Sequence, residues 1–383
     1  WHNKTKGKAQ RYSMERNPFF HRVDTAGRQL PYIDKVYMSV ASSGLIPAKA
    51  NAGEVDLQAK GLSFRDMPVL KQGEKNGRYV THLWPTGSGS HIAIYPNLTT
   101  TDPAWRRLNR DVRFRRALSL GIDRALINET LYFGLAREGG NAAIRSSPFY
   151  DRQRAEAWAQ YDPDFANALL DEIGLTLRDA NKIRLLPNGQ PLEIVIETAG
   201  ERLEEVEALQ LVGETWRELG VKLLTRPTDR DLLRNRTYSG QTVMTAWKGW
   251  DNGVPTANTS PAELAPTDQA TLCWSAWGEH YATGGSAGSA PDYAPARELL
   301  TFYKSWMDTE DEDRRSEIWR SMLAIHADQQ FIIGILCEAP QPVVVADSLR
   351  NVPKDGLYAW APGAHFGIHR PDEWWFDDAE RRA

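Results

Sequence analysis

Helical and strand-like patterns alternate along the chain between residues 160 and 247. A helix start at Asp162 is followed by a strand-like run over 192–198, by apolar residues at helical spacing over 201–219, and by a second strand that begins at Val221. Because an alternation of this kind brings helices onto the faces of a sheet, it predicts an α/β fold.

The rest of the chain adds further elements on both sides of this region. We expect strands over 33–40, 78–84, 91–96 and 331–336, and helices over 112–133, 163–173, 294–308 and 312–328. The apolar stripe of the first of these helices is expected to pack in the core and to touch no ligand; it consists of Phe114, Leu118, Ile122 and Leu126. Residues 250–293 are rich in Gly and Pro and read as a long loop, which is rare in a compact domain unless it is functional.

Charge and hydropathy exclude two classes of protein. The chain has 383 residues with 46 Lys+Arg and 50 Asp+Glu, a formal net charge of −4, and this argues against a nucleic-acid binder held by phosphate neutralisation. The longest uninterrupted apolar run, Phe331–Leu336, is far shorter than the roughly 20 residues of a membrane helix.

The sequence carries no local signature of catalysis, of a metal or of a cofactor. Its two cysteines, Cys273 and Cys337, exclude a disulfide-dense scaffold and a four-cysteine zinc site, while one bridge between them stays open. There is no His-Glu-x-x-His and no Gly-x-Ser-x-Gly, and the run Thr86–Ser90 lacks the Lys-Ser/Thr ending of a phosphate loop. We therefore predict no catalytic residue, no metal ligand and no cofactor.

One segment combines a charge with aromatic faces. Trp247, Trp250 and Asp251 stand at the end of a predicted strand, in a chain that has 14 Trp in all. A carboxylate flanked by two indole rings can offer a ligand both a charge and a stacking surface. The alternative is that Asp251 forms a helix cap or an Asx turn and that both Trp residues lie in the core.

Several segments, taken in order, resemble the family 5 extracellular solute-binding proteins of bacterial ABC importers, the receptors for oligopeptides, dipeptides, nickel and opines. Met14–Phe20 is similar to the Arg-Asn-Pro turn of that family, and Ala52–Leu57 to its Gly-Glu-Val-Asp turn. Further matches, at Leu30–Val36, Ile94–Leu98, Asp111–Leu118, Ile122–Ile127, Tyr161–Ala166, Leu169–Gly174 and Trp216–Val221, keep the order and spacing of the family across residues 14–255.

The resemblance implies a two-lobe fold of the periplasmic-binding-protein type, class II. Residues 1–105 would form the middle segment of lobe one, residues 343–383 would return to it, and residues 106–342 would form lobe two. Lobe one would be incomplete, because in the family about half of the chain precedes the Arg-Asn-Pro turn. A sheet that lacks strands would expose unpaired edges and apolar surface.

The resemblance also implies a function in transport. We expect the substrate-binding component of an ABC transporter, which binds an oligopeptide, an opine or an oligosaccharide in an inter-lobe cleft and delivers it to a permease in the inner membrane. The protein would be periplasmic, with its signal and N-terminal half outside this sequence, and monomeric when full length. It would bind no nucleic acid and would not be an enzyme. Two alternatives remain: a cleft hydrolase that acts on peptides or esters, and a ligand-sensing chemoreceptor adaptor.

The family further implies which residues hold the solute. Asp251 corresponds to the carboxylate that pairs with the α-ammonium group of a peptide, with Trp247 and Trp250 beside it. Tyr95 and Asn97 stand on the strand that faces the cleft in the family, where Asn97 would bond a ligand amide. Asn before a loop is also a common turn former, and this alternative stays open.

Overall fold

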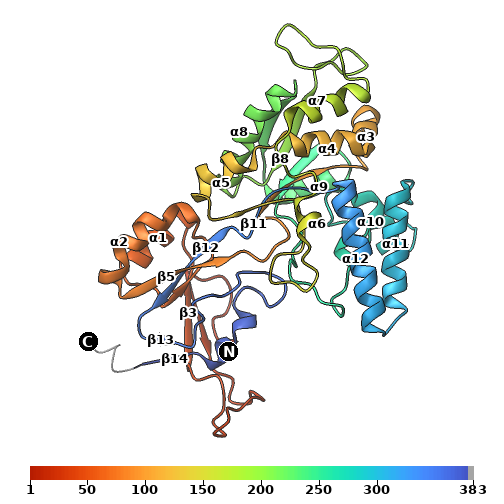
Figure 1. The fold of residues 1–383 in the computed structure, drawn as a ribbon. Helices are drawn as coiled ribbons and strands as arrows, with labels where there is room; N and C mark the ends of the chain where they lie inside the picture. The colour runs from red at the N-terminus through yellow and green to blue at the C-terminus, as the bar shows by residue number, and fades with distance from the viewer. Residues whose placement is uncertain (378–383) are drawn as a thin grey trace. The chain divides into compact units, whose positions relative to one another are not determined.

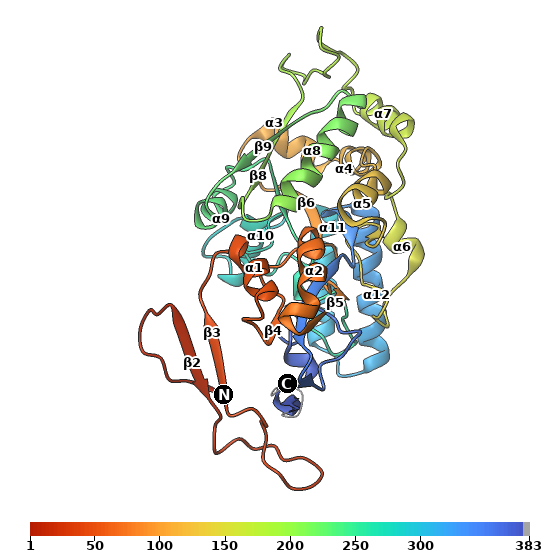
Figure 2. The ribbon, with the colours of Figure 1, turned by 90° about the vertical axis from the view of Figure 1, so that its left-hand side faces the viewer.

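The computed structural model describes residues 1–377 and divides the chain into two compact units. Unit 1 consists of Trp1–Thr86 together with the C-terminal segment that starts at Pro340, and unit 2 is the continuous stretch Gly87–Ala339. Figure 1 and Figure 2 show the helices and strands of each unit from two directions. In the part of the chain that is described, no helix is long and apolar enough to cross a membrane.

Unit 2 is built on a six-stranded mixed sheet with the strand order β7-β11-β6-β10-β8-β9. Its strands are β6 (Ile92–Pro96), β7 (Arg137–Glu138), β8 (Glu193–Thr198), β9 (Lys222–Pro227), β10 (Met244–Trp247) and β11 (Ile333–Cys337). β10, β8 and β9 run parallel to one another, and β6 runs antiparallel to both β10 and β11. The carboxyl ends of β8, β9, β10 and β11 therefore meet at one edge of the sheet, where β6 begins.

Helices cover both faces of this sheet (Figure 1). They are α3 (Pro103–Arg110), α4 (Val112–Leu120), α5 (Arg124–Tyr132), α6 (Arg152–Glu156), α7 (Pro163–Glu172), α8 (Leu203–Glu218), α9 (Arg230–Tyr238), α10 (Ser275–Ala282), α11 (Ala294–Met307) and α12 (Glu312–Gln329), with the 3-10 helix η3 (Ala262–Leu264). On one face α4, α5 and α8 pack together, and Trp216 Nε1 of α8 donates to the Leu118 carbonyl at 3.0 Å. On the other face Tyr95 lies in a core cluster with residues of α10, α11 and α12. The α/β architecture expected from the alternating pattern is confirmed.

Unit 1 contains two three-stranded sheets, β1-β2-β3 and β4-β12-β5, and a two-stranded ribbon. Its strands are β1 (His2–Asn3), β2 (Arg11–Glu15), β3 (Lys35–Ser39), β4 (Leu57–Gln58), β5 (Tyr79–Pro85), β12 (Pro340–Ala346), β13 (Leu349–Arg350) and β14 (Trp375–Phe376). Its helices are α1 (Ile46–Asn51) and α2 (Met67–Gly77), with the 3-10 helices η1 (Ser43–Leu45), η2 (Phe64–Asp66), η4 (Gly367–His369) and η5 (Pro371–Glu373). A core cluster that includes Leu70 and Val344 joins α2 to β12.

The longest pairing in unit 1 joins two strands that are far apart in the sequence. β5 and β12 are antiparallel neighbours, in a register that runs from Tyr79 opposite Ala346 to Pro85 opposite Pro340. The chain therefore leaves unit 1 at the end of β5 and returns to it at the facing residue of β12. All of unit 2 takes the place that a turn occupies in an ordinary hairpin.

Strand β3 exposes apolar side chains, and that this exposure follows from missing strands stays a prediction. Tyr37 and Met38 are more than half exposed, and so is Val40, which follows the strand. Such residues, close together in sequence, form a surface to which hydrophobic molecules can adhere.

One expectation differs from the structure. The helix expected over 112–133 is two helices, α4 and α5, because the backbone turns at Gly121 and Asp123 caps a new helix by accepting the Leu126 N–H at 2.9 Å. Residues 87–105 lie in unit 2, because β6 is hydrogen-bonded between β11 and β10. That the two units correspond to the two lobes remains a prediction.

Candidate functional site

The loop that follows β10, residues 248–253, lies at the edge where the carboxyl ends of the strands of unit 2 meet. Its backbone is fastened to a second loop, residues 87–90. The Gly249 N–H donates to Ser90 O at 2.7 Å, and the Gly253 N–H donates to Gly87 O at 2.8 Å. In return the Gly89 N–H donates to Trp250 O at 2.9 Å. The two loops thus form a rigid pair, and this fixes the direction in which the side chains of residues 248–253 point.

Glycine makes this close approach possible. A Cβ on Gly249 would lie against Asn141 Oδ1 and 2.5 Å from the Ser90 nitrogen, which is too close for any real pair of atoms. In the Gly-Ser run at 86–90, whose sequence lacks the features of a phosphate loop, a Cβ on Gly89 would likewise lie 2.5 Å from Asn141 Oδ1 and 3.0 Å from the Trp250 ring, so Gly89 has a packing role. Asn141 fills the remaining corner, where its Oδ1 accepts the Trp250 N–H at 3.2 Å.

A cavity of about 430 Å³ within unit 2 borders the 248–253 loop. Four of the five residues proposed from the sequence line it, namely Tyr95, Trp247, Trp250 and Asp251. The other lining residues are Arg230, Leu233, Arg234, Tyr238, Gly249, Ala262, Glu263, Thr267, Asp268, Ala270, Thr271, Leu272 and Ile332. Aromatic rings, cations and carboxylates thus converge on one space.

The two tryptophans of the loop differ in their surroundings. Trp247 is half-buried, and the Arg230 guanidinium lies over its ring, 5.0 Å from the centroid. Arg230 also forms an ion pair with Glu201. Trp250 is only 3% exposed, and its ring meets the imidazole of His326 edge-on at 5.2 Å. Trp250 is therefore part of the core and forms the cavity wall, whereas Trp247 offers the more accessible ring.

Asp251 is neither a helix cap nor the acceptor of an Asx turn. Its carboxylate forms an ion pair with Lys248, and about two fifths of its side chain is exposed. The Asx-type contact belongs to the next residue, because Asn252 Oδ1 accepts the Val254 N–H at 3.0 Å. The Asp251 N–H donates to Glu263 Oε1 at 2.6 Å.

Tyr95 and Asn97 have separate roles. The Tyr95 hydroxyl donates to the Lys248 carbonyl at 2.7 Å, and burial raises the pKa of this phenol well above its usual value. Asn97 is fully buried and does not line the cavity. Its amide donates to Thr242 O at 3.2 Å and its oxygen accepts the Thr99 N–H at 3.0 Å, as expected for a turn former. Whether any of the five residues contacts a solute remains a prediction.

The sequence analysis did not single out Arg230 and Glu263. Arg230 opens the helix that follows β9, so it stands near the carboxyl end of a parallel strand, where open α/β sheets bind ligands. That rule gives the signal by which it could have been found. Glu263 lies in the long loop 250–293, and nothing in the local sequence distinguishes it from the other acidic residues of the chain.

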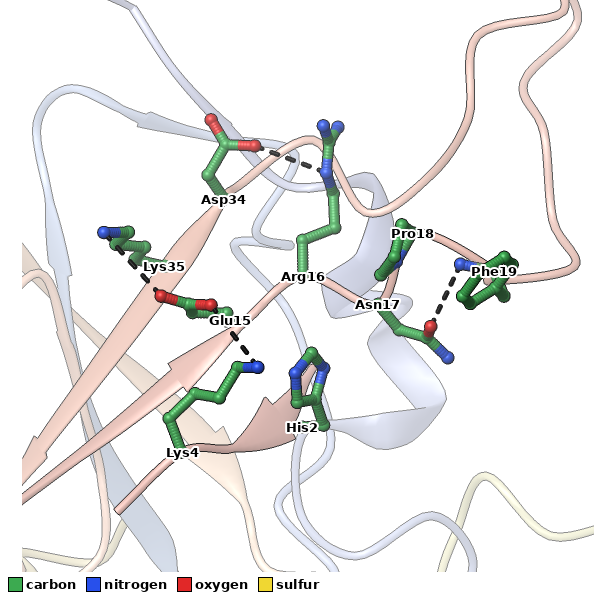
Figure 3. Close-up of a pocket in the computed structure, with 9 residues that line it drawn as sticks. All are labelled: His2, Lys4, Glu15, Arg16, Asn17, Pro18, Phe19, Asp34 and Lys35. Carbon is green, nitrogen blue, oxygen red and sulfur yellow. Dashed lines mark hydrogen bonds and ion pairs between the residues drawn. The ribbon is translucent and has the colours of Figure 1, made fainter.

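A second cavity, of about 810 Å³, lies in unit 1 around the Arg-Asn-Pro turn and is shown in Figure 3. Its charged residues are paired with one another: Arg16 with Asp34 at 3.3 Å, and Glu15 with both Lys4 and Lys35 at 3.8 Å. All of these side chains are more than two fifths exposed, so water screens them. None of the residues proposed as a site lies there.

The two cysteines and the acidic residues do not form a metal site in the part of the chain that is described. Cys273 and Cys337 are both free and buried. No group of three or more His, Cys, Asp or Glu among residues 1–377 could hold a metal ion.

Comparison with known proteins identifies one family of binding proteins. Residues 3–271 match the model described as bacterial extracellular solute-binding proteins, family 5 Middle. The periplasmic alpha-galactoside-binding protein of Rhizobium meliloti (strain 1021) is 23% identical over 370 residues, which covers 91% of this chain and 51% of that protein. The chain thus spans about half the length of this relative.

Solved structures of binding proteins share the fold. An oligopeptide-binding protein OppA is 30% identical, with a TM-score of 0.72 over 98% of this chain and 62% of that one. The periplasmic binding protein MelB of Agrobacterium fabrum C58, solved with stachyose, is 20% identical with a TM-score of 0.73, over 97% of this chain and 56% of that one. The expected two-lobe periplasmic-binding-protein type of fold is confirmed. Because the family model matches residues 3–271, more than half of the chain, this protein belongs to the family 5 extracellular solute-binding proteins of bacteria.

Proposed function

We propose that this protein is the solute-binding component of an ABC importer, which binds its solute in the periplasm and delivers it to a permease in the inner membrane. Membership of the family supports this, as do relatives that are named as binding proteins, two of them periplasmic. The mechanism is closure around the solute, and it needs no bond to be made or broken.

The cavity beside the 248–253 loop carries the proposal. It lies at the carboxyl end of β10, and its volume of about 430 Å³ suits a small solute or one part of a larger one. Trp247, Arg230 and Asp251 line it; the Arg230 guanidinium lies over the Trp247 ring, and Asp251 forms an ion pair with Lys248. A solute there would meet an aromatic surface beside polar groups that are already in place.

The charges favour a neutral, hydroxyl-rich solute such as an oligosaccharide. Lys248 compensates Asp251, so a cation would first have to displace Lys248 from the carboxylate. A sugar hydroxyl can bond to the Asp251 carboxylate without breaking the pair, and a sugar ring can pack on an indole. Relatives whose names or structures include an alpha-galactoside and stachyose agree with this solute class.

An oligopeptide is the second candidate. It is favoured by the 30% identity to an oligopeptide-binding protein and by the position of Asp251, which matches the residue that holds a peptide ammonium group in the family. The two candidates make opposite predictions for two residues of the site.

Calorimetric titration with stachyose and with trialanine separates them. For a sugar site, Trp247→Ala should weaken stachyose binding by about 2 kcal/mol or more, as for a well-packed interface tryptophan, while Asp251→Asn, which keeps an oxygen at the same place for a sugar hydroxyl, has little effect. For a peptide site, Asp251→Asn should cost about 2–5 kcal/mol in trialanine binding, as for half of a desolvated charged pair. Asp308→Asn, an exposed position on the far end of α11, is the matched control. Binding that neither Trp247→Ala nor Asp251→Asn alters would contradict this site.

A further inference from the structure

Glu263 occupies an unusual position for a carboxylate. It lies in η3, in the middle of the Gly- and Pro-rich stretch 250–293, and it lines the same cavity as Asp251. Its Oε1 accepts the Asp251 N–H at 2.6 Å, and the backbone of Asn252 also donates to it. Two successive backbone amides of the 248–253 loop therefore donate hydrogen bonds to one carboxylate, which comes from a separate segment of the chain.

We propose that Glu263 is a positioning residue for solute recognition: its carboxylate holds the amides of Asp251 and Asn252, and through them sets the direction of the Asp251–Lys248 ion pair at the cavity. This inference rests on the proposed function. Other amides of the loop are held by main-chain oxygens and by Asn141. The segment that bears the ion pair is held by a side chain whose charge can change.

The charge of Glu263 matters because its side chain is partly buried at the cavity wall. Burial raises the pKa of the Glu263 carboxyl to about 7, although the hydrogen bonds from the backbones of Asp251 and Asn252 oppose the rise. Above that pH the carboxylate accepts the two amides as charge-assisted hydrogen bonds, which are about twice as strong as neutral ones. Below it, the neutral acid holds the loop less firmly.

The other groups around Glu263 can be named. Tyr95, Arg230, Arg234 and Asp268 line the same cavity, Lys248 pairs with Asp251, and His326 bonds to the carbonyl of the adjacent Leu264 at 2.7 Å. Burial lowers the pKa of His326 to about 4 and raises that of Tyr95 well above its usual value, so both stay neutral near pH 7. Glu205 in α8 also has a pKa raised to about 7 by burial, and for this reason variants must be compared with the wild type at each pH.

Hydrogen exchange at single amides, measured by NMR on the full chain without any solute, tests the positioning directly. Glu263→Ala should lower the protection of the Asp251 and Asn252 amides about tenfold or more, as for loss of a hydrogen bond to a charged group. The Gly249 and Gly253 amides, which donate to the carbonyl oxygens of Ser90 and Gly87, should keep their protection. Glu263→Gln keeps an oxygen at the same place, so most of the protection should return. Glu298→Gln, on an exposed face of α11, is the control for charge alone.

The pH profile separates positioning from simple packing. In the wild type, corrected protection of the Asp251 and Asn252 amides should rise between about pH 6 and about pH 8, as the carboxyl ionises. In Glu263→Gln it should stay flat. Equal protection in wild type and Glu263→Ala, or equal loss at all four amides, would overturn the proposal.

Titration with stachyose adds the functional readout. We expect Glu263→Ala to weaken stachyose binding about tenfold, and Glu263→Gln to restore most of it and to remove its pH dependence. Unchanged binding in Glu263→Ala would overturn the link to recognition. If the wild type binds no stachyose, the proposed solute class fails, whereas the amide protection still decides whether Glu263 positions the loop.

Discussion

At the scale of single residues, the site is held by steric fit as much as by polar contacts. Gly249 and Gly89 let two loops lie against each other, and Asn141 closes the gap between them. The side chains that face the cavity are attached to this backbone, so their positions depend on atoms that make no contact with a solute. A substitution at one of these glycines should therefore shift the side chains that line the cavity.

We predict that Gly249→Ala lowers the free energy of unfolding by about 1–3 kcal/mol, since the added methyl group overfills a closed contact. Gly213→Ala is the matched control: a Cβ there meets only ordinary contact with Leu223, inside helix α8, and should stabilise the protein by about 0.5–1 kcal/mol. Urea unfolding measures both. If the two variants have equal free energies of unfolding, the 87–90 loop moves aside for the added methyl group without loss of stability.

The sequence predicted much of the cavity wall and little of what supports it. Trp247 and Asp251 could be found because they follow a recognisable strand, and Tyr95 because of its place in a family motif. Glu263 could not be assigned to the same site, because only the folding of a distant segment brings it to residue 251, whereas the position of Arg230 after β9 gave a signal that was not used. Asn97 shows the reverse case: its residue type and position suited a ligand contact, but its side-chain amide donates to Thr242 O instead.

At the scale of elements, hydrophobic periodicity located the helices but not every break. Phe114, Leu118 and Ile122 are fully buried, as their spacing predicts, whereas Leu126 is 42% exposed. The backbone turns at Gly121, and α5 starts again from Asp123 with a different face toward the core. A periodic pattern that is extended across such a break assigns the wrong face to the residues beyond it.

This difference gives a paired prediction. Leu118→Ala should lower the free energy of unfolding by about 2–5 kcal/mol, because it empties part of a closed core. Leu126→Ala, from the same apparent stripe, should change it by less than about 0.5 kcal/mol. Neither should alter the affinity of the folded protein for stachyose. A loss of affinity in Leu118→Ala without loss of stability would place that helix at the binding surface.

At the scale of the whole molecule, one unit is continuous in sequence and the other is not. Gly87–Ala339 contains a six-stranded sheet, helices on both of its faces and its own core. Unit 1 is assembled from the segments on either side. The resemblance to the family anticipated a discontinuous lobe, while the point of division could be seen only from the pairing of β6.

We predict that residues 87–339, expressed alone, fold and unfold in a single cooperative transition, because the contacts of their core lie within the fragment. Calorimetry and hydrogen exchange on the fragment measure this. A fragment without a heat-absorption peak and without protected amides in β6, β8 and β10 would show that unit 2 needs unit 1 in order to fold.

The facing residues Pro85 and Pro340 also couple the two units through chain entropy. While unit 2 is folded, its ends are held close together, and β5 and β12 can pair without a further search. If unit 2 unfolds, the same pairing must close a flexible loop of roughly 250 residues, at an entropic cost of about 5 kcal/mol. The stability of unit 1 therefore depends on that of unit 2 even without any contribution from an interface between them. The dependence arises because an unfolded unit 2 is a long flexible loop between β5 and β12, and it requires no native contact.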